Sequence, residues 1–333
     1  MISSIFALTL SFLGAAPESD NLHRYEATGR HMGVVFKIAI YSESETKAKL
    51  GFKAAFDRID ELNRTMSDYA PDSELSRLSR TSPTSQPVEV SCDLWQVLAK
   101  SQDLSKKTDG AFDITVGPLT KLWRRARRQK ELPSKQRLQE EMRAVGYQHL
   151  KLNRSNKSAS LSVPNMRLDL GGIAKGFAAD EALIAIKSQR ISQALVNASG
   201  DIALGDSPPG KSGWKIGIAP LDANSPPSRF LELSNCAVAT SGDAWQFVEV
   251  DGKRYSHIID PRTGLGVTNR SSVTIVAPNC TDADSLASAV SVLGPKAGIE
   301  LVDSISNAAA VVIQLKNGNP EAIESKLYSK LAK

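Results

Sequence analysis

The hydrophobic and polar residues of this chain follow two different periods, one typical of strands and one typical of helices. Short runs of apolar and β-branched residues predict strands at 34–41, 195–202 (broken by a turn), 214–219, 230–239 and 273–277. The dipeptide Asp251-Gly252 favours a tight turn, so we expect a hairpin between segments 245–250 and 255–259. Segments 311–315 and 320–331 close the chain.

Apolar residues three and four positions apart predict the helices. These helices are expected at 44–63, 91–108, 133–145, 176–188 and 282–293. In the first helix the residues expected on one side are Leu50, Ala54, Ile59 and Leu62, and in the second Leu94, Val97, Leu98 and Leu104 face inward. Strands in blocks with inserted helices predict an α+β fold with mixed or antiparallel sheets around one continuous core.

The first 20 residues are set apart from residues 21–333, which we expect to form one catalytic domain. Residues 2–16 are apolar, too short to span a bilayer, and end on small residues at Gly14 and Ala16. An export signal without a lipid anchor is expected here, because no cysteine lies nearby. No Lys or Arg precedes the apolar run, so a disordered start is the alternative.

Composition places the chain among globular proteins, with 41% hydrophobic and 23% charged residues. A net charge of +5 fits an anionic substrate without requiring nucleic acid, and no RNA-binding aromatic pattern is present. The basic run 121–130 predicts a solvated helix face with Leu122 and Trp123 turned inward, or alternatively a surface for an acidic partner or a membrane. The widely spaced Cys92, Cys236 and Cys280 argue against disulfides and zinc, and are expected to be partly buried.

The segment 168–180 carries the strongest chemical signal. An apolar run reaches Gly171-Gly172, then Lys175 and a helical pattern. Glycines let backbone N–H groups approach a ligand closely, and the start of a helix favours an anion such as phosphate. The alternative is a tight turn between a strand and a helix.

Several further motifs occur in a fixed order around this segment. They are 66–69 (MSDY), 73–78 (SELSRL), 110–119 (GAFDITVGPL), 240–243 (TSGD), 255–264 (YSHIIDPRTG) and 281–290 (TDADSLASAV). Together they resemble the ApbE family of FAD:protein FMN transferases, from about Thr28 to the last helix. The resemblance implies an ApbE-like α+β fold, related to the T-fold, and an FAD-binding cleft.

Asp284 and Ser288 are four residues apart on a predicted helix and therefore share a face. Their hard oxygen atoms suit Mg²⁺, although a helix acid beside a small residue is an equally simple interpretation of the spacing. The resemblance implies that Asp284, Ser288 and the carbonyl oxygen of Ala174 bind magnesium. The family has Thr where this chain has Ser288, so the hydroxyl is kept and a methyl is lost.

The remaining candidate residues rest partly on their own chemistry, as for Lys175 and Asp180, and partly on the resemblance, as for Tyr69, His257 and the residues of the cleft. Tyr69 is expected to stack against FAD, with a core tyrosine as the alternative. Lys175 could neutralise phosphate charge, or be an exposed helix lysine. His257 could assist proton transfer, or be a core or turn histidine. Asp180 is expected to be structural. The residues implied to line the FAD cleft are Met32, Ala111, Phe112, Asp113, Gly171 and Ile258, although Val34 stands where the family usually has Thr.

The expected reaction is the Mg²⁺-dependent transfer of FMN from FAD to a threonine hydroxyl of another protein, with release of AMP. An exported enzyme would meet membrane-associated redox proteins as acceptors. Two alternatives stay open. Water could replace the threonine, which would make the protein an FAD pyrophosphatase, or the chain could bind FAD without turnover.

Overall fold

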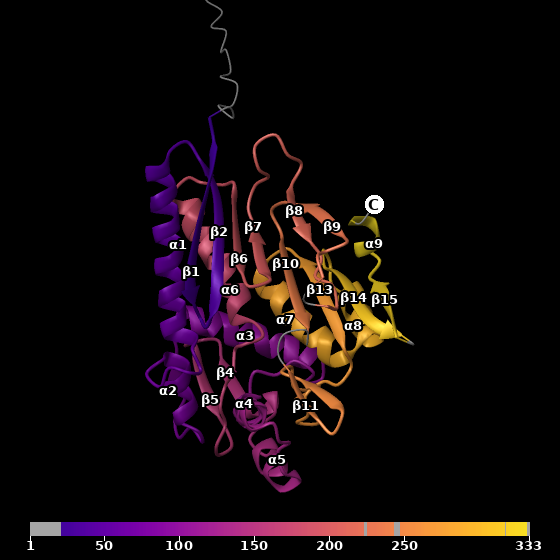
Figure 1. Cartoon of the computed structure of the whole chain (residues 1–333). Helices are drawn as coiled ribbons and strands as arrows, with labels where there is room; N and C mark the ends of the chain where they lie inside the picture. Colours follow the sequence, from indigo (N-terminus) through magenta and orange to yellow (C-terminus); the bar gives the residue numbers. More distant parts are fainter. Residues whose placement is uncertain (1–20, 223–224, 243–246, 317, 332–333) are drawn as a thin grey trace, which may run out of the picture.

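A twisted antiparallel sheet forms the centre of the molecule (Figure 1). The computed structural model describes residues 21–222, 225–242, 247–316 and 318–331. Its largest sheet has eight strands in the order β1-β2-β6-β7-β10-β13-β14-β15, and every neighbouring pair is antiparallel. The N-terminal hairpin thus occupies one edge of the sheet and the C-terminal hairpin the other.

The strands of this sheet are β1 (His23–His31), β2 (Val34–Ser42), β6 (Ala194–Ala198), β7 (Asp201–Leu204), β10 (Ala237–Gly242), β13 (Ser271–Ala277), β14 (Ala309–Lys316) and β15 (Asn319–Glu324). Three small sheets are built from β3 (Val88–Glu89) with β5 (Ser158–Leu161) and β4 (Leu150–Asn153), from β8 (Trp214–Gly217) with β9 (Phe230–Leu233), and from β11 (Phe247–Val250) with β12 (Lys253–Ser256). The helices are α1 (Glu45–Met66), α2 (Glu74–Arg80), α3 (Cys92–Lys107), α4 (Gly117–Gln129), α5 (Lys135–Met142), α6 (Ala174–Ser188), α7 (Cys280–Leu293), α8 (Pro295–Asp303) and α9 (Tyr328–Leu331), with a 3₁₀ turn at Tyr147–His149.

Successive side chains of a strand point to opposite faces of the sheet. An apolar cluster covers each of the two faces of the large sheet. On β2, Phe36 and Ile38 join the larger apolar cluster, in which α1, α6 and α7 pack together. Ala39 points the other way, into a second cluster that contains Trp214 of the β8–β9 hairpin and Tyr328 of α9. Helices α1, α6 and α7 therefore cover one face of the sheet, and the β8–β9 hairpin and α9 cover the other.

The predicted fold class is confirmed, since helices and antiparallel sheets share one structure. The expected helices are all present, and residues 199–200 and 251–252 turn the chain as predicted. Segment 230–239 is divided into β9 and β10, α5 is shorter than expected, and segment 320–331 contains a strand followed by a helix. Residues 1–20, Asp243 and residues 245–246 lie outside the described residues, and so does any export signal.

Leu50 was expected on the buried side of α1, and this is wrong because the side chain is 54% exposed. The buried side is formed instead by Ala48, Gly51, Ala55, Ile59 and Leu62. A Cβ added at Gly51 would lie 3.0 Å from Ile40 of the sheet, so small residues set how closely α1 approaches it. Cys92, the first residue of α3, is exposed rather than partly buried.

Helices α6 and α7 pack against each other at Gly176 of α6, whose side chain is a single hydrogen atom. A Cβ added at Gly176 would lie 2.2 Å from the carbonyl oxygen of Cys280 and 2.8 Å from Cβ of Asp284. Four residues further on, Asp180 accepts hydrogen bonds from the backbone N–H groups of Cys280 (2.7 Å) and Thr281 (2.8 Å) and from the Thr281 hydroxyl (2.6 Å). Asp180 is therefore structural, because it satisfies amides at the start of α7.

Among the described residues, no helix combines the length and the apolar character that crossing a membrane requires.

We predict that Asp180→Ala lowers the free energy of unfolding by about 2–3 kcal/mol, because two amides at a buried helix start lose their acceptor. Urea denaturation measures the change. The matched control is Asp57→Ala, which removes an exposed carboxylate of α1 from an i,i+4 pair with Lys53 and should cost no more than about 0.5 kcal/mol. An equally small loss in Asp180→Ala would show that Asp180 does not support α7.

Candidate active site

The Gly171-Gly172 turn lies directly before α6. The backbone N–H groups of Ile173 and Ala174 both donate to the carbonyl oxygen of Leu170, and this closes the turn. Side chains of Ser44, Ser91 and Asn279 cap α1, α3 and α7, but Ile173 at the start of α6 provides no capping side chain. The side chain that bonds an amide at the start of α6 comes from another helix, since Asp284 of α7 accepts the N–H of Gly176 at 3.0 Å. The positive end of the helix dipole still favours an anionic ligand nearby.

Gly172 brings this turn against α7 and the 110–119 segment. A Cβ at Gly172 would lie 2.8 Å from the hydroxyl oxygen of Ser288 and 3.4 Å from the ring of Phe112. The structure thus places Ser288, Phe112 and the glycine turn together, although they are far apart in the sequence. The reason for glycine at this position is close approach, since no positive φ is found there.

Three charged side chains form a buried cluster beside the turn. Lys175 forms a short ion pair with Asp201, and its Nζ lies 3.6 Å from Oδ1 of Asp284. The other oxygen of Asp284 accepts the backbone N–H of Gly176 at 3.0 Å. Asp201 and Asp284 are almost fully buried, and Lys175 is not the exposed helix lysine of the alternative interpretation.

The pKa values in this cluster reflect burial and mutual charge. Burial and the neighbouring carboxylate of Asp284 raise the pKa of Asp201 above that of an ordinary aspartate. Burial works against the charge of Lys175, but the carboxylates of Asp201 and Asp284 outweigh it and raise the lysine's pKa. Asp201 and Asp284 share the single positive charge of Lys175, so a further cation beside Asp284 would reduce the repulsion between the two carboxylates.

The predicted magnesium ligands fit such a cation in their chemistry. Asp284 supplies a buried carboxylate, and Ser288 supplies a hydroxyl on the same helix face, next to Gly172. Ala174 is the first residue of α6, and a backbone carbonyl has a second lone pair even when one is used in a helix. All three donors are oxygen atoms, as Mg²⁺ prefers. Among the described residues, no three His, Cys, Asp or Glu side chains are grouped as a metal cluster.

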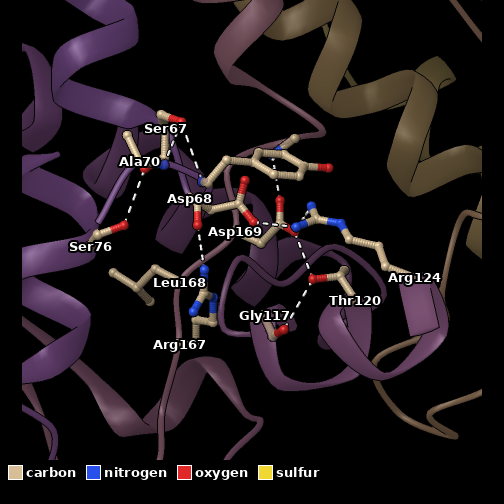
Figure 2. A network of polar contacts seen from close by, with 12 residues as sticks. Ser67, Asp68, Ala70, Ser76, Gly117, Thr120, Arg124, Arg167, Leu168 and Asp169 are labelled. Atoms are coloured by element: carbon tan, nitrogen blue, oxygen red, sulfur yellow. Dashed lines mark hydrogen bonds and ion pairs between the residues drawn. The ribbon is translucent and has the colours of Figure 1, made fainter. Parts of the chain in front are cut away.

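A second polar network includes Asp169, which directly precedes Leu170 and the glycine turn (Figure 2). Arg124 of α4 contacts Asp68 at 2.5 Å and Asp169 at 2.9 Å. Asp169 also accepts the Thr120 hydroxyl at 2.7 Å and the backbone N–H of Gly171 at 2.8 Å. Tyr69 follows Asp68 and is 74% exposed, so the alternative of a core tyrosine is wrong.

The remaining predicted residues lie at several places in the fold. Ala111 and Asp113 are buried, and Asp113 accepts hydrogen bonds from the backbone N–H (2.8 Å) and hydroxyl (2.7 Å) of Thr115. Burial raises the pKa of Asp113 despite these bonds. Met32 lies in the turn between β1 and β2, at a φ of 49°.

His257 and Ile258 follow β12, on the hairpin that packs against α4 through the rings of Tyr255 and Trp123. His257 is exposed, which rules out a core histidine. The structure thus gathers Lys175, Ala174, Asp284, Ser288, Gly171 and Phe112 around one turn, whereas Met32, His257 and Ile258 come from two separate hairpins.

Two cavities lie away from these residues. One of about 150 Å³ is lined by α4 and the loop that leads into α5, and one of about 600 Å³ by α8, β14 and β15. Neither holds a predicted site residue, so the buried charges and the glycine turn define the candidate site better than cavity size does.

Two residues of the site escaped the sequence analysis. Asp201 directly follows the Ser199-Gly200 turn, where both residues have positive φ, and an acid after such a turn is a weak signal. Arg124 belongs to the basic run whose face was expected to be solvated. Leu122 and Trp123 are buried as predicted, but Arg124 reaches back to Asp68 and Asp169.

The fold matches those of solved flavin transferases. The flavin transferase ApbE from Vibrio cholerae superposes with a TM-score of 0.83 at 28% identity, over 93% of this chain and 99% of that one. The ApbE protein from Thermotoga maritima gives 0.83 at 27% identity, over 93% and 100%.

The chain belongs to the ApbE family, whose sequence model matches residues 32–313. It is 31% identical to the FAD:protein FMN transferase of Haemophilus influenzae, over 96% of this chain and 94% of the relative. It is also 31% identical to that of Escherichia coli K12, over 90% of this chain and 88% of the relative.

Proposed function

We propose that this protein is an FAD:protein FMN transferase that depends on Mg²⁺ and modifies a threonine of an acceptor protein. The hydroxyl oxygen of the threonine attacks the phosphorus on the FMN side of the FAD pyrophosphate. A new O–P bond forms, the bond to the AMP phosphate breaks, and AMP leaves while the threonine proton passes to a base. The observation that carries this proposal is the glycine turn at the start of α6, next to the buried Asp284 and the half-buried Ser288.

Different residues of the chain would contribute to different parts of this reaction. The positive end of the α6 dipole favours the phosphates, and Gly171 and Gly172 allow close approach. The ring of Tyr69 offers an exposed stacking surface for FAD. Lys175 holds Asp284 in place and adds positive charge beside the phosphates. His257 is exposed and could take up the threonine proton.

Asp284, Ser288 and the Ala174 carbonyl are the groups proposed to hold Mg²⁺. When bound, the ion would supply positive charge that stabilises the pyrophosphate oxygens as the bond breaks. The names of the relatives support the transfer of FMN to a protein.

The acceptor and the location of the protein are further parts of the proposal. An acceptor threonine on a membrane-associated redox protein, and export to the cell envelope, rest on the apolar segment 2–16 and on the proposed chemistry.

Asp284→Asn tests the metal site with the least disturbance, because the amide oxygen can still accept the Gly176 N–H while the charge is lost. We expect AMP release to fall at least a hundredfold, and the rise in Tm that Mg²⁺ causes in the wild type to vanish. Ser288→Ala should lose less of the AMP release and less of the Mg²⁺-dependent rise in Tm, since water can replace one of the six ligands of the ion. Normal turnover by Asp284→Asn would refute the assignment of Asp284 to the metal.

Tyr69→Ala tests the stacking surface. Loss of a stacked aromatic costs on the order of 1 kcal/mol beyond burial, so we expect the Kd for FAD to rise about fivefold. Isothermal titration calorimetry measures it, and Tyr69→Phe is the control that keeps the ring and should stay within about twofold of the wild type. A Kd that does not change in Tyr69→Ala would place the ring outside the FAD site.

The transfer itself is tested with an acceptor peptide that contains one threonine, mixed with FAD and Mg²⁺. We expect a mass increase equal to the covalent addition of FMN, retained flavin fluorescence and one AMP per labelled peptide. A peptide with alanine in place of threonine should remain unlabelled. Rapid formation of free FMN and AMP, with no label on any acceptor, would instead establish hydrolysis as the reaction.

A further inference from the structure

Arg124 joins two buried carboxylates that come from distant parts of the chain. Its guanidinium contacts Asp68 in the loop between α1 and α2, and Asp169 in the segment before the glycine turn (Figure 2). The Asp68 and Asp169 side chains are 10% and 7% exposed. Burial and the charge of Asp169 raise the pKa of Asp68, and the contact with Arg124 opposes this rise.

Each carboxylate that Arg124 holds is tied to a backbone segment of the proposed FAD site. Asp169 accepts the N–H of Gly171, so its position fixes the glycine turn. Asp68 directly precedes Tyr69, and the Asp68 carbonyl also accepts a short hydrogen bond from Arg167. The loop tyrosine and the glycine turn are therefore connected through one side chain.

Arg124 also contacts Tyr69 directly. Its Cζ lies 4.2 Å from the centre of the Tyr69 ring, which is within the range of a cation–π contact. An aromatic ring that is 74% exposed gains little from burial, so this contact is what holds its orientation. One face of the ring meets the arginine, and most of the remaining ring surface stays accessible.

A network that only stabilised the fold would not need this arrangement. Burying two carboxylates on one guanidinium is costly, and apolar side chains of similar size would serve stability equally well. The planar guanidinium, by contrast, can pair with two carboxylates and stack on a ring at the same time, which a lysine cannot do.

We propose that Arg124 is a positioning residue, which fixes the Tyr69 ring relative to the Gly171 turn so that FAD meets both at once. This role rests on the proposed function, since it concerns the binding of FAD. Arg124 acts through Tyr69 and Asp169 and does not itself react.

The test is a double-mutant cycle on FAD affinity, measured by calorimetry with the full chain. Arg124→Met should raise the Kd for FAD about tenfold when Tyr69 is present, and at most twofold in the Tyr69→Ala background. Arg124→Lys, which keeps the charge but not the planar contacts, should give an intermediate rise and a nearly normal Tm. Equal losses with and without Tyr69 would refute the proposal, as would full affinity in both Arg124 variants.

Arg125→Met is the matched control, because Arg125 is the next residue of the same helix, is exposed and bonds only Gln129 among the described residues. It removes the same charge and should leave the Kd unchanged. A loss equal to that of Arg124→Met would assign the effect to the general charge of α4 and refute the positioning role.

Hydrogen–deuterium exchange of the protein without FAD separates this proposal from the proposed function. In Arg124→Met, amides of 67–72 and 169–172 should exchange at least tenfold faster, whereas those of β15 should not change. Unchanged exchange in 67–72 would refute the positioning role. If the wild type does not bind FAD at all, the proposed function fails, and the exchange result alone decides whether Arg124 orders these segments.

Discussion

The close approach of α6 and α7 at Gly176 is the contact on which the rest of the site depends. No side chain larger than hydrogen fits there, because a Cβ would meet the Cys280 carbonyl at 2.2 Å. The approach brings Asp284 to the Gly176 amide and Asp180 to the first amides of α7. The same contact thus caps one helix and places the buried acid at the start of the other, so stability and chemistry are linked.

Burial of charge follows from this geometry. Asp201 and Asp284 lie where water is excluded, and Lys175 compensates only one of the two negative charges. Such a cluster is costly in a fold that needs only stability, and it gains from a bound cation or from a ligand that reorganises the lysine. The unfavourable repulsion between the carboxylates of Asp201 and Asp284 therefore lies next to the start of α6, which favours phosphate.

The sequence allowed much of the fold to be predicted, because the apolar period is clear where a helix packs on one side. In α3 the expected Leu94, Val97, Leu98 and Leu104 are all buried. The prediction was wrong at Leu50, since the small residues Ala48, Gly51 and Ala55 form the buried face and carry little hydrophobic signal. The edge strand β1 was missed, because its exposed positions hold polar residues and few apolar ones mark it.

The site was predictable only where its residues lie in motifs. Asp284 and Ser288 are spaced by one helical turn, and the glycines precede a helix, so local pattern pointed to both. Asp201 and Arg124 gain their roles from partners that lie far away in the sequence. The partners of Asp201 are Lys175 and Asp284, and those of Arg124 are Asp68 and Asp169. A basic run gives no sign of which of its arginines turns inward, because that choice is made by tertiary contacts.

The two ends of the site differ in exposure, and this difference matters for a reaction with a protein as acceptor. Asp201 and Asp284 are buried, whereas Tyr69 and His257 are exposed. A dry, fixed environment strengthens electrostatic interactions with phosphate, but a group on an acceptor protein can enter only from an open side. An open side also admits water, so under the proposed function selectivity for threonine over water would come from how firmly the exposed residues hold FAD and the acceptor. The exposed loop at Tyr69 is tied to the buried turn through Arg124, so the ordered buried part of the structure is connected to its exposed side.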